Sequence, residues 1–355
     1  MNDLRLHGLS PRCGRGTPLA RDAITDIGGI RVGHATVAEG ARQTGVTVLS
    51  VHDGDAYRDK VPAGVAVING FGKSVGLLQI EELGTLDTPI ALTNTFSVGA
   101  IASAQIRQAV AANPAIGRGA PTLNPLVLEC NDGVLNDIQA MALDDSHYAA
   151  ALQARDAVFA QGAVGAGRGM VSFDLKGGIG SASRRAATAY GDYGVGALVL
   201  SNFGRLPQLR VAGQALAERL GATRPTSTPP EMGSIIMVLA TDAPLDARQL
   251  TRLARRAGAG LARTGSVYGH GSGDIALAVS TAYTIPQDAA RPMPGLAMLH
   301  ESLLDPLFEA AAESVEQAIV RALWRAETVT GRDGQCRDAI TARLPDWRAL
   351  WPALC

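Results

Sequence analysis

The sequence lacks an excess of charge of either sign. Its 355 residues include 32 Lys and Arg against 33 Asp and Glu, which gives a formal net charge of −1 at pH 7. Proteins that bind nucleic acid carry a basic surface, so this balance predicts that nucleic acid is not a partner. Aromatic residues are also few, at 4%, whereas 46% of residues are hydrophobic. This composition is typical of a globular α/β protein rather than a disordered or fibrous one.

Long apolar runs are missing as well. No segment approaches the roughly 18 consecutive apolar residues that a membrane-spanning helix needs. The first twenty residues mix arginine with proline and glycine, and they contain no apolar core of a secretory signal. We therefore expect a cytoplasmic protein with no membrane partner and a flexible N-terminal tail over residues 1–22.

Cysteine and histidine patterns exclude two further classes of site. The four cysteines are scattered, with no CxxC pair, and the six histidines form neither HxxxH nor HExxH. The sequence therefore predicts neither a disulfide framework nor a metal site. No cofactor motif is complete either, because Val67 stands where a phosphate-binding loop ending at Lys73-Ser74 needs its first glycine.

Apolar strands and amphipathic helices make up the rest of the chain. Strands are expected over residues 44–51, 63–69, 89–95, 126–133, 194–200, from 234 onward and 275–281. Helices are expected over 77–83, 98–111, 146–161, 246–262 and 302–328, and a partly helical segment over 208–224. The dense glycines of residues 162–180 suggest close backbone approach. Residues 23–355 therefore predict one layered α/β or α+β domain, with a linker at 225–230.

The Gly233-Ser234 peptide bond joins that linker to an apolar strand, so a hydroxyl occupies the first position of the strand. If Ser234 attacked the carbonyl of Gly233, the peptide bond would become an ester. Hydrolysis would then free an amine beside the hydroxyl, a combination that activates terminal Ser and Thr nucleophiles. Gly233 has no Cβ to obstruct the attack. The same dipeptide is also an ordinary hinge, and this stretch alone leaves both readings open.

Three further polar clusters lie at the ends of apolar strands. They are Glu129-Cys130-Asn131, Ser201-Asn202 and Ser272-Gly273-Asp274. Each cluster taken singly is also explained by a turn. Together with Ser234 they supply a nucleophile, a hydroxyl and carboxylate pair to move its proton, amide donors for an oxyanion, and a carboxylate for a cationic substrate group.

These clusters and their surroundings resemble the DmpA family of self-processing aminopeptidases, which includes the β-peptidyl aminopeptidases and corresponds to peptidase family S58. The resemblance runs from about Ile24 to Gly334. The matching segments cover residues 24–36 (ITDIGGIRVGHAT), 61–84, 88–99, 128–137 (LECNDGVLND), 173–184, 201–204, 233–245 (GSIIMVLATDAPL) and 271–281 (GSGDIALAVST).

The resemblance implies a four-layer αββα sandwich, similar to that of the N-terminal nucleophile hydrolases but differently connected. It implies cleavage between Gly233 and Ser234 into a large chain, 1–233, and a small chain, 234–355, which stay associated. It also implies a homo-oligomer, with a tetramer as the expected size, and no cofactor.

Roles in the site are carried over by motif from the same resemblance. The nucleophile is Ser234, Ser272 and Asp274 assist it, Asn202 contributes to the oxyanion site, and Glu129 holds the free amino group of the substrate. Two positions depart from the pattern. Asn131 stands where characterised members can carry Tyr, and Asp274 stands where some members have Glu, so the substrate preference follows less directly than the type of reaction.

The expected activity is that of a cofactor-free serine aminopeptidase or amidase. It would release the N-terminal residue of a short peptide, amide or ester through a Ser234 acyl-enzyme, with β-peptides among the candidate substrates. Two alternatives stay open. One is an acyltransferase similar to ornithine acetyltransferase or a nylon-oligomer amidase, although both favour a Thr nucleophile over Ser234. The other is an uncleaved, non-catalytic binding protein.

Overall fold

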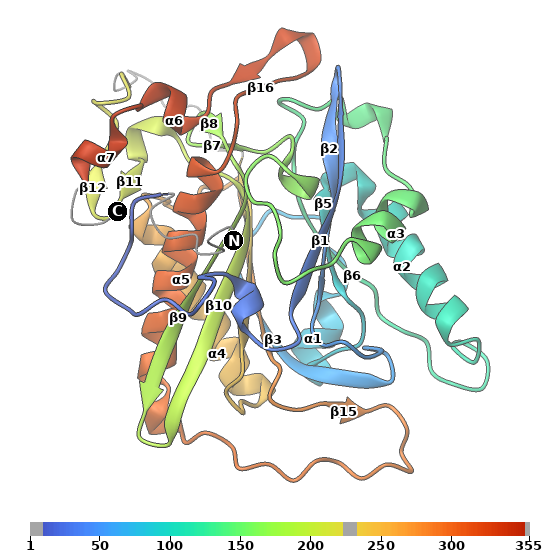
Figure 1. Cartoon of the computed structure of the whole chain (residues 1–355). Coiled ribbons are helices and arrows are strands. Elements are labelled where there is room, and N and C mark those ends of the chain that lie inside the picture. The colour runs from blue at the N-terminus through green and yellow to red at the C-terminus, as the bar shows by residue number, and fades with distance from the viewer. Residues whose placement is uncertain (1–9, 223–232, 352–355) are drawn as a thin grey trace.

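The structure is a computed structural model that describes residues 10–222 and 233–351, and two main β-sheets form its centre (Figure 1). The smaller sheet has the strand order β1 (Arg31–Glu39), β2 (Arg42–Ser50), β5 (Ile90–Asn94) and β6 (Leu126–Cys130). The larger sheet has the order β15 (Ile285–Pro286), β3 (Asp59–Gly70), β14 (Gly273–Ser280), β13 (Ser234–Thr241), β10 (Gly191–Asn202) and β9 (Gly178–Thr188), and β4 (Thr85–Leu86) pairs with β3. The linker expected at 225–230 lies outside the described residues.

Helices cover the outer faces of both sheets. The smaller sheet packs against α2 (Val98–Ala112) and α3 (Asp145–Gln153), and the larger sheet packs against α4 (Ala247–Arg263) and α5 (Asp305–Trp324). Shorter elements are α1 (Leu77–Leu83), α6 (Ile340–Arg343), α7 (Trp347–Leu350), β7 (Val171–Ser172), β8 (Leu175–Lys176), β11 (Arg210–Val211), β12 (Gln214–Ala215), β16 (Val329–Thr330) and β17 (Cys336–Arg337). In Figure 1 the layers run from α2 and α3 at the right to α4 and α5 at the left, which confirms the expected four-layer αββα sandwich.

Apolar side chains fill the spaces between the layers because side chains alternate across each strand. Leu198 of β10 and Ile236 of β13 pack between the two sheets. Their neighbours Val199 and Met237 point the other way, toward α4 and α5. A separate cluster joins the smaller sheet to α2 and α3. Strands buried on both faces read as continuous apolar runs, which is how the sequence predicted them.

Each main sheet contains one parallel pair of strands joined by a helix. In the smaller sheet α2 connects β5 to β6, and in the larger sheet α4 connects β13 to β14. A parallel pair needs such a long connection, because a tight turn can only reverse the chain. Asp246 caps the start of α4 by accepting a hydrogen bond of 2.7 Å from the N–H of Gln249. As a result, β13 and β14 begin side by side at one end of the sheet.

Two predicted helices are longer than the helices in the structure. The helix expected over 146–161 ends at Gln153, because the chain then pairs with β1. Asp156 and Val32 exchange backbone hydrogen bonds of 3.0 and 3.1 Å, which requires extended backbone. The helix expected over 302–328 covers only Asp305–Trp324, after a short 3-10 turn.

The segment predicted as partly helical, 208–224, is described as far as residue 222, and this part contains the β11–β12 hairpin. Ala212 and Gly213 form its two-residue turn with positive φ angles of 48° and 79°. Two consecutive positive φ angles match the right-handed twist of paired strands, which is why such turns close hairpins. The prediction was wrong here because the turn sequence contains only one glycine.

Glycine allows α5 to lie directly on β9. A Cβ at Gly180 would lie 1.9 Å from the carbonyl oxygen of Ala318 in α5, a distance that no side chain can occupy. At Gly178, which has a φ of 145°, a Cβ would lie 2.1 Å from the oxygen of Gly162. The close backbone approach predicted from these glycines is therefore confirmed. The strand itself, β9, was not among the predicted strands.

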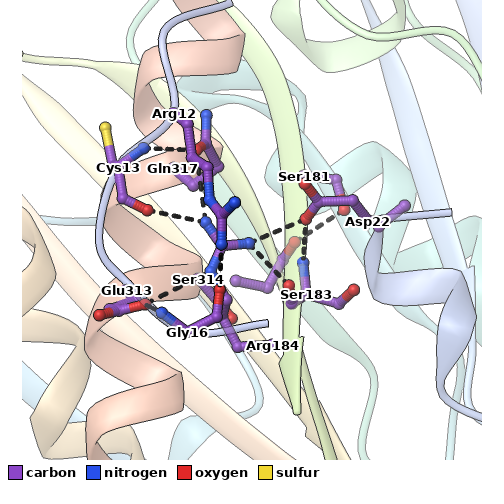
Figure 2. Close-up of polar contacts among 12 residues, drawn as sticks. Arg12, Cys13, Gly16, Asp22, Ser181, Ser183, Arg184, Glu313, Ser314 and Gln317 are labelled. Atoms are coloured by element: carbon purple, nitrogen blue, oxygen red, sulfur yellow. Dashed lines mark hydrogen bonds and ion pairs between the residues drawn. The ribbon is translucent and has the colours of Figure 1, made fainter. Parts of the chain in front are cut away.

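Residues 10–22 form an ordered segment along α5 and β9 (Figure 2). The N–H of Cys13 donates to Gln317 Oε1 at 2.8 Å, and the N–H of Gly16 donates to Glu313 Oε2 at 2.7 Å. The carbonyl of Cys13 in turn accepts a hydrogen bond of 2.9 Å from Arg184. The sequence predicted a flexible tail over residues 1–22. Residues 10–22 are instead held against α5 and β9, and residues 1–9 lie outside the described residues.

Asp22 ends this segment between two buried arginines. Its carboxylate lies 3.0 Å from Arg184 Nη1 and also pairs with Arg321. Burial alone would raise the pKa of Asp22, but the two guanidinium groups outweigh it and hold the pKa below its usual value of 3.8. The charged pair therefore stabilises the folded chain at neutral pH.

We predict that Asp22→Asn destabilises the protein by about 3 kcal/mol at neutral pH, because two buried cations lose their counter-charge. Asparagine tolerates the positive φ of 51° at this position, so the change tests charge rather than backbone strain. Because the folded pKa is depressed, this stabilisation is full above about pH 4 and is lost as pH falls through the folded pKa.

Thermal unfolding followed by circular dichroism between about pH 3 and pH 7 measures this effect. The wild type and Asp22→Asn should differ by a constant amount at the higher pH values, and the difference should shrink as the pH falls below about 4. Asp53→Asn is the control, because Asp53 is 77% exposed and contacts Arg31 only at 4.0 Å. A midpoint for Asp22→Asn as high as that of the control at pH 7 would contradict the prediction.

Candidate active site

Four strands of the larger sheet bring their ends to one place. Ser234, the first residue of β13, pairs with Asn202 at the end of the antiparallel strand β10. On its other side Ser234 pairs with Gly273, the first residue of the parallel strand β14. Gly273 pairs in turn with Gly70 at the end of β3. The strand order therefore gathers segments that lie far apart in the sequence.

Ser234 is nearly buried, with 6% of its surface exposed, and its hydroxyl contacts the preceding peptide group. Its Oγ donates a hydrogen bond of 2.7 Å to the carbonyl oxygen of Gly233 and accepts one of 3.3 Å from the N–H of Gly273. A Cβ at position 233 would lie 2.6 Å from the Cα of Phe203. Only glycine fits in front of this serine.

Ser272 and Asp274 flank Gly273, the residue paired with Ser234. Ser272 Oγ donates a hydrogen bond of 2.6 Å to Asp274 Oδ1, and both side chains are buried. Asn69 of β3 fixes the loop before them, because its Nδ2 donates to the carbonyl of Gly269 at 3.0 Å and also to that of Ser272. The contact between Ser272 and Asp274 shows that an aspartate at position 274 is long enough to reach the Ser272 hydroxyl.

The side-chain amide of Asn202 is held at both of its ends. Its Oδ1 accepts a hydrogen bond of 2.8 Å from the N–H of Val171, and its Nδ2 donates one of 2.9 Å to the carbonyl of Asn131. The backbone donor at Val171 determines which end of the amide is nitrogen. Val171 belongs to the β7–β8 hairpin, which the buried Lys176 secures by donating from Nζ to the carbonyls of Met170 and Gly177, each at 2.8 Å.

Glu129 enters the site from β6 of the opposite sheet and is 3% exposed. Its Oε1 accepts a hydrogen bond of 2.8 Å from the N–H of Lys73, and its Oε2 accepts one from the hydroxyl of Thr95. Two neutral donors orient this carboxylate without neutralising its charge. A negative charge held in this way is suited to binding an ammonium group.

The neighbours of Glu129 are less directly involved. Asn131 is exposed, and its Oδ1 accepts a hydrogen bond of 2.9 Å from the N–H of Gly133, so its side chain closes a turn while its backbone carbonyl holds Asn202. Burial raises the pKa of the Cys130 thiol well above its usual value, and the carboxylates of Glu129 and Asp274 raise it further. The thiol therefore stays protonated and does not compete with Ser234 as a nucleophile.

The structure thus brings together Ser234, Ser272, Asp274, Asn202 and Glu129. The Asn131 side chain instead forms part of a turn through its contact with Gly133. Three groups that were not predicted from the sequence hold these site residues in place: the side chains of Asn69 and Thr95 and the N–H of Val171. Asn69 carried a usable signal, since it ends an apolar strand as the other polar clusters do. Thr95 carried the same signal, since it follows the last residue of β5, whereas Val171 carried none because its contact is made by a backbone N–H.

The described part of the chain gives no indication of a metal centre. Within residues 10–222 and 233–351, no three His, Cys, Asp or Glu side chains are grouped as ligands for an ion. The same residues include no helix with the length and apolar content required to cross a bilayer.

Several proteins of known function or structure are similar to this chain. The β-peptidyl aminopeptidase BapA of Sphingosinicella xenopeptidilytica is 37% identical over 338 residues, which cover 89% of this chain and 84% of that protein. A solved β-aminopeptidase structure from Burkholderia sp. is 42% identical with a TM-score of 0.87, and the match covers 97% of this chain and 98% of that one.

A third similar protein is the L-aminopeptidase D-Ala-esterase/amidase of Ochrobactrum anthropi, which is described as a prototype for the serine aminopeptidases and a variant of the Ntn hydrolase fold. Its structure is 33% identical with a TM-score of 0.87, and the match covers 98% of both chains. The model of peptidase family S58 matches residues 22–337. The chain therefore belongs to peptidase family S58 and is a hydrolase that acts on peptide bonds.

Proposed function

We propose that this chain cuts itself between Gly233 and Ser234 and then acts as a serine aminopeptidase on short peptides, amides or esters. The observation that carries the proposal is the position of Ser234 Oγ, 2.7 Å from the carbonyl oxygen of Gly233 at the start of β13. The hydroxyl is already in contact with the group that it would attack.

Self-cleavage would proceed in two steps. Ser234 Oγ bonds to the carbonyl carbon of Gly233, and the peptide nitrogen leaves with a proton as the α-amine of Ser234, so that an ester replaces the amide. Water then hydrolyses the ester. The products are the carboxylate of Gly233 and a Ser234 that carries both a free hydroxyl and a free amine.

Substrate hydrolysis would use the same serine. Its Oγ attacks the substrate carbonyl while the new α-amine, assisted by the Ser272 and Asp274 pair, receives the hydroxyl proton and passes it to the leaving group. The NH2 group of Asn202 uses one hydrogen on the carbonyl of Asn131, and its other hydrogen can stabilise the oxyanion. Water then releases the acyl group from Ser234.

Glu129 would select substrates that have a free N-terminal amine. An ammonium group pairs with a carboxylate that two donors already orient, whereas an acylated amine lacks the charge for this contact. The names of the β-peptidyl aminopeptidase and β-aminopeptidase relatives support β-amino acyl groups among the substrates.

The two products of self-cleavage would stay associated, since the sheet order interleaves them. The small chain contributes β13 and β14, which lie between β3 and β10 of the large chain. Helix α5 of the small chain also packs on β9 and β10 of the large chain. Cutting one peptide bond before β13 leaves all of these contacts in place.

We extend the proposal to the setting of the enzyme. The cysteines at 13, 130 and 336 are free thiols, which supports a reducing, cytoplasmic location. Assembly into a homo-oligomer, with a tetramer as the expected size, rests on the family resemblance, and size-exclusion chromatography with light scattering measures it.

Intact mass spectrometry of the purified wild type under denaturing conditions tests self-cleavage. We expect two masses, corresponding to chains that end at Gly233 and begin at Ser234. A panel of aminoacyl p-nitroanilides then tests the activity, with N-acetylated analogues as controls that Glu129 should not accept. One intact mass, or equal hydrolysis of the acetylated analogues, would contradict the proposal.

A further inference from the structure

Gly72 borders the space between Glu129, whose carboxylate is proposed to bind the substrate amine, and β14, the strand that pairs with Ser234. It lies in the loop between β3 and α1, and both of its neighbours are tied to the site. The N–H of Phe71 donates to the carbonyl of Ser272 at 3.3 Å, and the N–H of Lys73 donates to Glu129 Oε1 at 2.8 Å. The position of Gly72 relative to both groups is therefore fixed.

The absent side chain of Gly72 leaves room for about one methyl group. A Cβ built there would lie 3.5 Å from Ile275 Cδ1, 3.7 Å from Glu129 Oε1 and 3.9 Å from the Cα of Gly273. These are ordinary van der Waals distances, so the position is unoccupied but closely bounded.

Gly273 connects this space to the nucleophile. A Cβ at Gly273 would lie 3.2 Å from the Cα of Gly72, so the two backbones are in contact. The N–H of Gly273 donates to Ser234 Oγ at 3.3 Å. One boundary of the space is thus Glu129, and another is the residue that contacts the reacting hydroxyl.

We propose that Gly72 sets the length of the acyl residue that fits between Glu129 and Ser234, and that its missing side chain admits the extra backbone methylene of a β-amino acyl group. This inference rests on the proposed roles of Glu129 and Ser234. An α-amino acyl group has one carbon between its amine and the scissile carbonyl, and a β-amino acyl group has two. With both ends held, the additional carbon must occupy the space that Gly72 borders.

The variant Gly72→Ala fills this space without disturbing the backbone. The φ angle of Gly72 lies outside the left-handed region, and every contact of the new Cβ is 3.5 Å or longer. Self-cleavage should therefore remain complete, which intact mass spectrometry can establish before kinetics are measured.

The test compares kcat/KM for glycyl and β-alanyl p-nitroanilide, which differ by a single backbone methylene. Gly72→Ala should lower hydrolysis of the β-alanyl substrate about tenfold or more and that of the glycyl substrate less than about threefold. Gly70→Ala is the matched control, since its new Cβ would meet only Val67 Cγ1 at 3.4 Å, and it should keep the wild-type ratio.

Three results would overturn the inference. They are an equal loss on both substrates in Gly72→Ala, an unchanged ratio of the two, and a wild type that hydrolyses the glycyl but not the β-alanyl substrate. A wild type that hydrolyses neither substrate would instead overturn the proposed function and, with it, the inference. The wild-type rates therefore distinguish the two failures.

Discussion

Ser234→Ala should yield one uncleaved chain of 355 residues with no detectable aminopeptidase activity. The substitution removes only the hydroxyl that lies 2.7 Å from the carbonyl oxygen of Gly233, so the fold should persist. Without that oxygen no ester can form, the peptide bond before β13 stays intact, and neither the nucleophile nor the free α-amine appears. Intact mass spectrometry and hydrolysis of aminoacyl p-nitroanilides measure the two losses separately.

Ser280→Ala is the matched control for this variant. Ser280 is also a buried serine of the same sheet, but it lies at the opposite end of β14 and donates to the carbonyl of Ala243 at 2.6 Å. Its loss should reduce stability by about 1 kcal/mol and leave self-cleavage complete. Two fragments from Ser234→Ala would place the cleaving nucleophile at another residue.

Glu129→Gln should reduce kcat/KM for substrates with a free amine by about 100-fold, equivalent to about 2.7 kcal/mol. Glutamine keeps the size of the side chain but removes the negative charge that would pair with the ammonium group. Esters without an amine should lose only a few-fold. Self-cleavage should continue, because the peptide group at Gly233 presents no free amine for Glu129 to bind.

The comparison requires parallel kinetics on an aminoacyl p-nitroanilide and on an ester of matched size that lacks the amine. Glu82→Gln, which makes the same chemical change at an exposed position of α1, should leave both rates unchanged. Equal losses on the two substrates in Glu129→Gln would remove Glu129 from amine recognition.

Much of the fold could be predicted from local sequence patterns. The helix at Leu77–Leu83 and the strand that begins at Ser234 follow from apolar spacing and were predicted within a residue or two. The end of α3 could not be predicted, because a distant strand, β1, competes for the backbone of Asp156. Long-range pairing of this kind overrides local helical preference.

The candidate site was predicted as a set of residues but not as an arrangement. A polar residue at the end of an apolar run identified Glu129, Asn202 and Ser234 individually. The proximity of Asn202 and Ser234 depends on the insertion of β13 between β10 and β14, and the proximity of Glu129 depends on the packing of β6 against the larger sheet. Residue spacing alone encodes neither arrangement. The backbone donor at Val171, which orients Asn202, leaves no trace in residue type, because every residue except proline has an N–H.

The interleaved sheet also determines how the protein can recover from unfolding. Before cleavage β13 and β14 are covalently joined to β10, so refolding is unimolecular. If the chain cuts itself as proposed, the large chain would keep β3 and β10 without the two strands that separate them. Two polypeptides would then have to meet before the sheet could close, and recovery would become bimolecular and dependent on concentration. The proposed cleavage would therefore make folding effectively irreversible at low concentration, and the lifetime of the cleaved enzyme would be set by how slowly it unfolds.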